Sequence, residues 1–363
     1  MGICAFCSDE KSETSRVTDS EMEKSTRNIF RLLVLGVSNS GKSTLCQHLT
    51  YLHGHGFGRA ELQMYKHIIR SNVVEYMQQI LMQRRNPDNK SFNVKPKLIE
   101  AAEYVMSSEV ESNGYFGFTE EMYKELMKLW DDREIRETKV ESMDDNATFF
   151  LNKLNILSLS GYCPSPEDVL HSRVRSAGFG RSTFSVKDGH FEMTDVGEET
   201  SDLRKWSLGY EMATSVLFII SLTSYSEISR EARGKEEEQK TEENTNPRTD
   251  MERSIRLFKD ICEESKLQHA SIILFLNKLE IFKKRIKQIP LKNCRAFASF
   301  EGPEGDFKSA VEYIKKTIPS HVQVKRRIYV YLTCAIDEKN VRRIFENVSD
   351  TLQSEAQKQV PRA

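Results

Sequence analysis

The chain has 363 residues, of which 38% are hydrophobic and 29% charged, and its formal net charge is -1. A chain of this length buries a substantial core and is long enough for two domains. A net charge this close to zero gives no overall attraction to nucleic acid, so we expect no nucleic-acid partner. No apolar run reaches the roughly 18 residues that a membrane-spanning helix needs, and the N-terminus lacks the apolar core of a secretory signal.

Cysteine usage indicates a reducing compartment. The chain contains seven cysteines, and only Cys4 and Cys7 stand in a CxxC spacing. A disulfide framework or a structural zinc site needs more such pairs, so the sequence predicts neither.

Residues 1–28 are predicted to form an N-terminal segment that anchors the chain to a membrane. The segment opens MGICAFC, with Gly2 exposed once the initiator is removed and Cys4 and Cys7 close behind. N-myristoylation favours Ser or Thr where this chain has Phe6. Two acyl chains give stable attachment, so lipid on Gly2 and on Cys4 or Cys7 would suffice. The alternative is an unmodified tail.

Short apolar runs predict one six-stranded α/β sheet. The later runs are continuously apolar and separated by helical segments, which favours mostly parallel strands. Lys187-Asp188-Gly189 predicts a hairpin in which Asp-Gly supplies the positive φ. The expected strands are 29–36 (IFRLLVLG), 183–186 (TFSV), 190–195 (HFEMTD), 215–222 (SVLFIISL), 271–277 (SIILFLN) and 328–334 (IYVYLTC). A closing helix is expected to pack on this sheet through apolar residues at helical spacing, namely Val341, Ile344, Phe345, Val348 and Leu352.

Two stretches differ from this pattern. Residues 58–170 show apolar residues at three- and four-residue spacing with no convincing strand, as in MYKHIIRSNVVEYMQQILMQ. We therefore expect an all-helical domain inserted into an α/β domain made of 29–57 and 171–363. Residues 227–252 are charged and poor in apolar residues, and they predict a flexible surface loop.

The stretch GVSNSGKS, Gly36 to Ser43, is the strongest local signal. It matches G-x-x-x-x-G-K-[ST] after a strand and before a helix, the arrangement that cradles phosphates with backbone N–H groups and a helix N-terminus. Lys42 is predicted to neutralise the β and γ phosphates and Ser43 to bind Mg²⁺. The residues expected around the phosphates are Gly36, Asn39, Ser40, Gly41, Lys42, Ser43 and Thr44.

The stretch NKLE, Asn277 to Glu280, follows an apolar strand, at the end of the sheet where ligands bind. Its carboxylate can accept hydrogen bonds from the ring N–H and exocyclic amine of guanine, and Asn277 and Lys278 complete the arrangement. A second strand end offers the backbone N–H of Ala335 to the guanine oxygen. Together these residues predict a guanine nucleotide, GDP or GTP, as the cofactor, with Mg²⁺.

Three histidines, His48, His53 and His55, could suggest a metal. They fall at a helix end and in the glycine-rich stretch HGHGFG, so we expect surface or linker histidines instead.

The phosphate loop GVSNSGKS (the P-loop), the helical insertion and four further stretches occur in an order that resembles the α subunits of heterotrimeric G proteins. The four stretches are DVLHSRVRSAG, TDVGEETSDLRKW, LFLNKLE and TCAIDEKNV. The resemblance covers the chain from about residue 28 and implies a Ras-like P-loop GTPase domain. It places Arg173 as the built-in arginine finger, Ser176 and Asp195 as Mg²⁺ ligands with Ser43, and Lys205 and Trp206 on the surface that meets βγ. Around the nucleotide it also places Asp145, Leu170, Arg173, Ser176, Gly197 and Glu198.

The chain departs from the family pattern at the phosphates. Glu198 stands where the family has a glycine, and Glu199 where it has the glutamine that orients the attacking water. Asn39 replaces the glutamate that pairs with the arginine finger, and Glu280 replaces the guanine-reading aspartate. Two unit charges 4 Å apart repel by about 1 kcal/mol in bulk water and by about 4 kcal/mol at an effective dielectric of 20. We therefore expect GTP to be disfavoured and hydrolysis, which involves Arg173 and Glu199, to be slow.

Two interpretations stay open at this point. The first is a GDP/GTP switch at the cytoplasmic face of the plasma membrane, with a βγ dimer, a receptor that contacts the C-terminal helix, and a downstream effector as partners. The second is a nucleotide-binding scaffold with little or no turnover, which Glu198 and Glu199 favour. A small-molecule P-loop kinase fits less well, because NKLE and the helical insertion are then unexplained.

Overall fold

The computed structural model describes residues 29–54, 56–85, 92–108, 118–138, 140, 145–174, 179–196, 203–228 and 249–359. The expected N-terminal segment, 1–28, lies outside these residues, as do positions 229–248 of the expected charged loop.

Six strands form one sheet in the order β2-β3-β1-β4-β5-β6. Only β2 and β3 pair antiparallel, and the other neighbours are parallel. The predicted six-stranded, mostly parallel sheet is therefore confirmed. The strands are β1 (Ile29–Leu35), β2 (Phe179–Val186), β3 (Gly189–Val196), β4 (Ser215–Ser221), β5 (Ser271–Asn277) and β6 (Ile328–Leu332).

The hairpin between β2 and β3 differs from the prediction in two respects. Strand β2 begins at Phe179, before the apolar run, because its antiparallel pairing extends to Phe179 opposite Val196. The positive φ falls on Lys187 (53°), and the expected Asp-Gly pair does not supply it. Gly189 is needed for space, since a Cβ there would lie 2.9 Å from the Phe191 ring.

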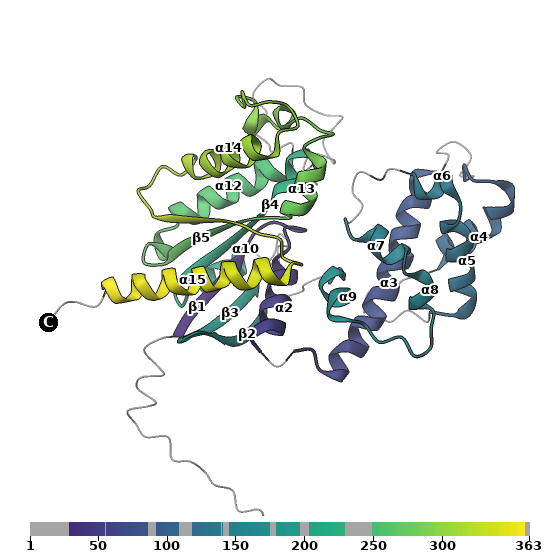
Figure 1. The fold of residues 1–363 in the computed structure, drawn as a ribbon, viewed down its shortest axis with the longest axis horizontal. Helices are drawn as coiled ribbons and strands as arrows, with labels where there is room; N and C mark the ends of the chain where they lie inside the picture. Colours follow the sequence, from purple (N-terminus) through teal and green to yellow (C-terminus); the bar gives the residue numbers. More distant parts are fainter. Residues whose placement is uncertain are drawn as a thin grey trace, which may run out of the picture.

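Alternating residues of the central strands face two apolar cores. Leu33, Phe218 and Leu274 pack on one face with helices α10 (Leu203–Tyr210), α12 (Asp250–Glu263), α13 (Leu279–Arg285) and α14 (Phe307–Ser320). Leu32, Leu217 and Phe275 pack on the other with α2 (Lys42–His53) and α15 (Glu338–Gln359). In Figure 1 the yellow helix α15 crosses the sheet on the side away from α12 and α14. Short 3-10 turns are η1 (Pro96–Leu98), η2 (Leu222–Ser226), η3 (Ser265–Leu267), η4 (Leu291–Asn293) and η5 (Arg295–Phe297).

The closing helix packs as predicted, with Val341, Ile344, Phe345, Val348 and Leu352 all buried. The predicted loop 227–252 extends too far at its C-terminal boundary, because α12 begins at Asp250 and Met251 is fully buried. An isolated β-bridge pairs Ile228 with Thr249, the last described residue before positions 229–248 and the first one after them.

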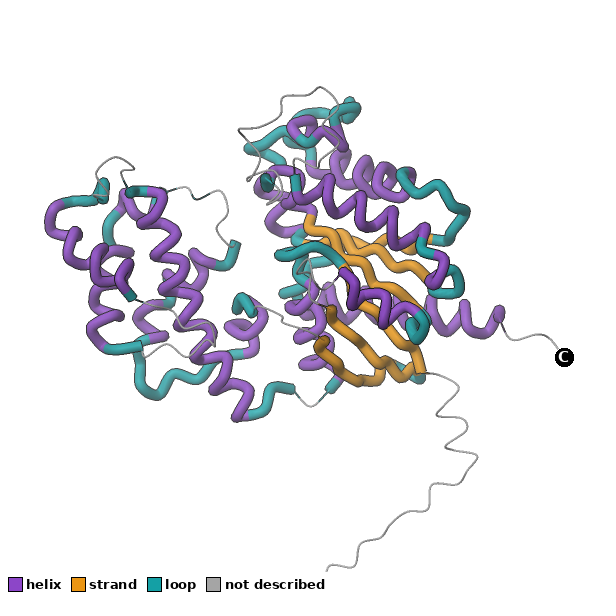
Figure 2. The backbone as a smooth tube through the Cα atoms, turned by 180° about the vertical axis from the view of Figure 1, so that it is seen from behind, coloured by secondary structure: helices purple, strands orange, loops and turns teal. Residues whose placement is uncertain are grey.

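The remaining helices form a second body, here called the helical body, beside the sheet body (Figures 1 and 2). All six strands of the described chain lie in the sheet body. The helical body has a core of its own that includes Tyr76, Leu126 and Phe150. Its helices are α3 (Arg59–Gln83), α4 (Ile99–Ser107), α5 (Glu120–Trp130), α6 (Arg133–Arg136), α7 (Ala147–Leu151), α8 (Leu154–Leu157) and α9 (Pro166–His171).

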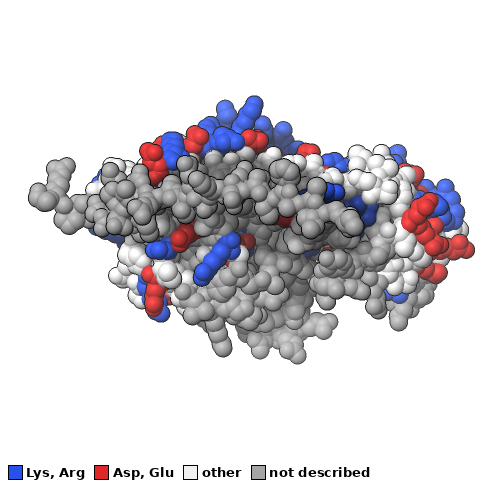
Figure 3. Space-filling view, turned by 90° about the horizontal axis from the view of Figure 1, so that it is seen from below, with Lys and Arg blue, Asp and Glu red and all other residues white. Residues whose placement is uncertain are grey.

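Charges of both signs share the surface seen in Figure 3. Lys and Arg gather along one edge of this view, and Asp and Glu lie beside them. Of the helices that the structure describes, none is long and apolar enough to cross a membrane.

Candidate functional site

The loop between β1 and α2 has a shape that requires glycine at two positions. Gly36 has φ 146°, and a Cβ there would lie 2.3 Å from the carbonyl oxygen of Ile219. Gly41 has φ 94°, and its Cβ would lie 2.2 Å from the Asn277 amide nitrogen. Asn39 also takes a left-handed conformation, with φ 60°. The backbone therefore curls tightly before the first turn of α2, which contains Ser43 and Thr44.

The Lys42 side chain is folded back onto this loop. Its ammonium donates hydrogen bonds to the carbonyl oxygens of Gly36 (2.8 Å) and Val37 (2.9 Å), and the residue is 7% exposed. The hydroxyl of Ser40 is buried without a hydrogen-bond partner. A buried cation and a buried polar atom thus lie within one short loop.

Ser43 and Asp195 meet at the ends of α2 and β3. The Ser43 hydroxyl donates to one Asp195 carboxylate oxygen at 3.0 Å, and the other carboxylate oxygen is buried without a partner. Burial raises the pKa of Asp195, while Lys42 and the Ser43 hydrogen bond oppose this rise. Hydroxyl and carboxylate oxygens are the ligands that Mg²⁺ prefers, so this pair fits the ion. The described residues include no group of three or more His, Cys, Asp or Glu suited to a metal.

The Asn277 side chain joins three segments. Its amide nitrogen donates to the Ser40 carbonyl at 2.9 Å. Its amide oxygen accepts from the Thr333 hydroxyl and from the Ala335 N–H, each at 3.1 Å. The Ala335 N–H, which we expected to be free for a guanine oxygen, is thus already bonded, and a base has to share or displace that bond.

Glu280 lies next to this junction with one carboxylate oxygen buried and unpartnered. Burial and a hydrogen bond with Glu280 raise the pKa of Cys334 to about 12. The thiol beside the Glu280 carboxylate is therefore protonated at neutral pH. The unpartnered Glu280 oxygen can accept a hydrogen bond from a ligand.

An ionic contact joins the two bodies beside this site. Asp145, just before α7 of the helical body, accepts from Lys278 at 3.0 Å and from Arg285 at 2.7 Å. Lys278 also donates to the Asn39 side chain at 3.0 Å, and Arg285 pairs with Glu227 at 2.7 Å. The sequence predicted Asp145 and Lys278 as site residues, whereas Arg285 and Glu227 were missed because nothing local distinguishes them from surface charges.

A second, uncharged contact lies at Arg173, the residue after the C-cap of α9, where the chain leaves the helical body. The side-chain amide of Asn72 in α3 accepts from the Arg173 N–H at 2.9 Å and donates to the Arg173 carbonyl at 3.2 Å. Leu170 is buried nearby in α9. Asn72 is a polar residue within the apolar run IIRSNVVEY, and this is its one local signal in the sequence.

Two predictions about individual side chains are wrong. His48 is neither a surface nor a linker residue, because its ring is 1% exposed and its Nδ1 lies 2.7 Å from the Ala335 carbonyl oxygen. Trp206, a residue of α10 that we expected on a partner surface, is 1% exposed and packs in the core between α10 and the sheet.

Other predicted residues lie outside the described part of the chain. These are Gly2, Cys4, Cys7, His55, Ser176, Gly197, Glu198 and Glu199, together with the side chain of Lys205.

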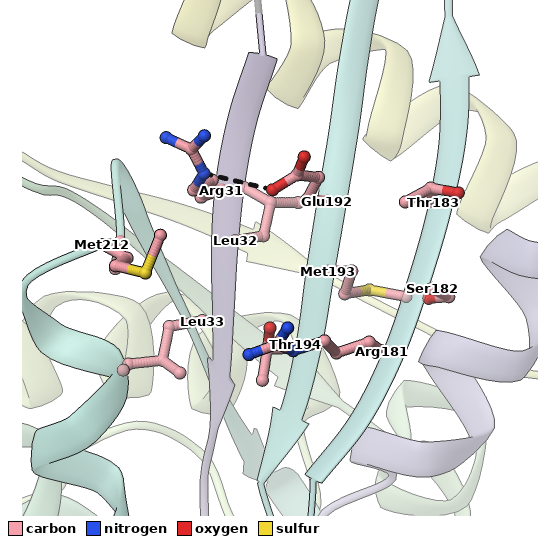
Figure 4. A pocket seen from close by; sticks show the side chains of 12 residues that line it. Arg31, Leu32, Leu33, Arg181, Ser182, Thr183, Glu192, Met193, Thr194 and Met212 are labelled. Carbon is pink, nitrogen blue, oxygen red and sulfur yellow. Dashed lines mark hydrogen bonds and ion pairs between the residues drawn. The ribbon is translucent and has the colours of Figure 1, made fainter.

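A separate hollow of about 480 Å³ lies between the sheet and the end of α10. Figure 4 shows Arg31 and Glu192 paired at its rim, 3.1 Å apart, with Arg181 and Met212 also lining the hollow. Met212 is 61% exposed.

The fold and the loop after β1 define a Ras-like P-loop protein with an all-helical insertion. A family model described as "G-protein alpha subunit" matches residues 8–352. The chain is 28% identical to the Guanine nucleotide-binding protein alpha-1 subunit of Caenorhabditis elegans over 353 residues, 95% of this chain and 94% of that protein. It is 29% identical to the Guanine nucleotide-binding protein G(o) subunit alpha of the same organism over 359 residues, 96% of each chain. The chain therefore belongs to the G-protein alpha subunit family.

Proposed function

We propose that this chain binds GDP and GTP with Mg²⁺ and works as a heterotrimeric G-protein switch with slow GTP hydrolysis. The observation that carries the proposal is the Asn277 amide, which bonds to Ser40 of the P-loop and to Ala335 behind β6 at the same time. It joins the segment suited to phosphates to the segment suited to the base. The names of the two relatives support a guanine nucleotide as the ligand.

Ser43 and Asp195 are the residues that would hold Mg²⁺, with Ser176 as a further candidate. Bound there, the ion would neutralise charge on the β and γ phosphates. Lys42 would leave the Gly36 and Val37 carbonyls and turn toward the phosphates. Glu280 would accept from the guanine ring N–H and amine through its unpartnered oxygen.

Arg173 would stabilise charge on the phosphates during hydrolysis, and Glu199 would contact the attacking water. A carboxylate at 199 can accept a hydrogen bond from water but cannot donate one toward the phosphate. A carboxylate at 198 would repel the γ-phosphate. These two residues support slow turnover, and they also favour the second candidate, a nucleotide-binding scaffold.

The partners follow from family membership. We propose a βγ dimer that binds beside α10 and Lys205, a receptor that contacts α15, and a downstream effector. A lipid anchor on Gly2, Cys4 or Cys7 would hold the protein at the cytoplasmic face of the plasma membrane. The domain division proposed for these roles is 29–57 with 171–363 for the GTPase and 58–170 for the insertion.

The test is to load the purified protein with fluorescent GDP or GTP in the presence of Mg²⁺, using ATP as competitor. We expect guanine nucleotides, and not ATP, to displace the probe, and Lys42→Ala to abolish loading. Single-turnover phosphate release should then be slow and should rise in Glu199→Gln. Loading without release would favour the scaffold, and absence of loading in the wild-type protein would contradict both candidates.

A further inference from the structure

The Asn72 side chain makes an unusual pair of contacts for a residue in the middle of a helix. Asn72 lies in α3, is 6% exposed, and stands beside the fully buried Val73 and Val74. Its amide bonds to both backbone polar groups of one residue, Arg173, which is 101 positions away in the sequence. A buried amide left unpaired costs about 1–3 kcal/mol, so these bonds hold it in one orientation.

Paired in this way, the Asn72 amide fixes the backbone of Arg173. An amide that accepts from the N–H and donates to the C=O of the same residue restrains both dihedral angles of that residue. Arg173 follows directly on α9, and the connection back to β2 starts there. The direction in which its side chain leaves the backbone is therefore determined by a residue of the helical body.

The P-loop provides no substitute for this restraint. Asn39 carries no charge, and its side-chain oxygen accepts from Lys278 at 3.0 Å. Among the described residues, the Arg173 guanidinium has no hydrogen bond or ion pair. The restraint that the structure shows on Arg173 is thus at its backbone.

We propose that Asn72 is a positioning residue for GTP hydrolysis, which acts by holding the Arg173 backbone so that the guanidinium reaches the phosphates. The proposal rests on the proposed function of Arg173. Since Asn72 belongs to α3, the placement of Arg173 depends on this amide contact and not on the ionic contact at Asp145.

The test is a double-mutant cycle of Asn72→Ala and Arg173→Ala, read by single-turnover phosphate release from bound GTP. Displacing a catalytic group by about 1 Å costs up to 10²-fold in rate. We expect Asn72→Ala to slow release by about ten- to a hundredfold and to cause no further loss in the Arg173→Ala background. Nucleotide affinity should stay near the wild-type value.

Gln78→Ala is the matched control. Gln78 lies on the same helix, and its amide also makes two hydrogen bonds to backbone carbonyls, those of Val105 and Ser108, but within the helical body. It should lower stability to a similar degree without changing the rate of release. Equal slowing by Gln78→Ala, or further slowing by Asn72→Ala when Arg173 is already alanine, would overturn the proposal.

A second readout serves if wild-type turnover is too slow to measure. GDP with aluminium fluoride mimics the transferring phosphoryl group, and transition-state mimics report interactions made only in the transition state. Asn72→Ala and Arg173→Ala should each weaken binding of the mimic by about tenfold while leaving GDP binding intact. Unchanged binding in Asn72→Ala alone refutes the positioning role, whereas unchanged binding in Arg173→Ala refutes the proposed function of the arginine.

Discussion

Two contacts made by the helical body near the candidate site differ in kind. The ionic contact, Asp145 with Lys278 and Arg285, joins charged side chains that are 13–23% exposed. The amide contact, Asn72 with Arg173, joins a neutral buried side chain to backbone. Charge pairs that reach solvent weaken with salt, whereas a buried neutral hydrogen bond does not. The comparison suggests that the ionic contact controls nucleotide release and the amide contact controls hydrolysis.

The largest expected effect concerns the residue held by the amide contact. Arg173→Ala should slow single-turnover GTP hydrolysis by about 10³-fold, because arginine fingers contribute about 10³–10⁵ in rate. GDP dissociation should change little, since no phosphate charge develops in that step. Phosphate release and dissociation of fluorescent GDP, measured on the same preparation, check this. A matching rise in GDP dissociation would assign Arg173 to the closure of the two bodies and not to the chemistry.

Asp145→Asn should have the opposite profile. It leaves Lys278 and Arg285 as two like charges without their shared partner. Removal of one member of a fully buried ion pair costs about 3–5 kcal/mol, and the partial exposure here reduces that. We expect GDP dissociation to be about tenfold faster and hydrolysis to be nearly unchanged.

Glu134→Gln is the control for this charge removal. It breaks an ion pair with Arg84 that lies inside the helical body, where Glu134 is 58% exposed. GDP dissociation should stay at the wild-type rate. If both variants release GDP equally fast, the effect comes from loosening of the helical body and the ionic contact has no special role.

Salt should distinguish the two contacts without mutation. Raising the ionic strength from about 0.1 M to 1 M shortens the Debye length from about 10 Å to about 3 Å. GDP dissociation from the wild-type protein should then accelerate by about two- to threefold, and less so in Asp145→Asn. Single-turnover hydrolysis should be insensitive to the same change. If the rate of hydrolysis changed with salt concentration as much as the rate of GDP dissociation, the two contacts would not have separate roles.

The smallest expected effect concerns pH and His48. Burial lowers the pKa of His48 from its ordinary value of 6.5, and the nearby charge of Arg342 lowers it further. The hydrogen bond to Ala335 and the charges of Glu338 and Asp337 oppose this decrease in pKa. The unfolded chain then binds more protons than the folded one below about pH 6.5, so the free energy of unfolding should fall as the pH drops through that value. His48→Gln should flatten the slope in part, because burial lowers the pKa of His53 as well. Denaturant midpoints between about pH 5 and 7.5 measure this.

Much of the fold was predictable because its signals are local. The apolar runs placed all six strands, and the glycines of the loop before α2 are required by positive φ and close approach at Gly36 and Gly41. The apolar spacing from Val341 to Leu352 gave the buried face of α15. The strand end at Phe179 was missed because it depends on pairing with β3 and not on its own composition.

The contacts of the candidate site were less predictable because they join distant parts of the chain. Asn72 and Arg173 lie 101 positions apart, Asp145 and Arg285 lie 140 apart, and His48 and Ala335 lie 287 apart. Periodicity within a helix shows that a residue faces inward but not what it meets. His48 was therefore misplaced on the surface, and Arg285 was not recognised as a site residue.

The measurement that tests the division between the two contacts most directly is made on one sample of Asp145→Asn loaded with GTP. Phosphate release is followed in a single turnover, and dissociation of the resulting GDP is followed next. We predict wild-type phosphate release followed by GDP dissociation about tenfold faster than in the wild-type protein. Slowed phosphate release with unchanged GDP dissociation would contradict the account, because the ionic contact would then serve hydrolysis and not nucleotide retention.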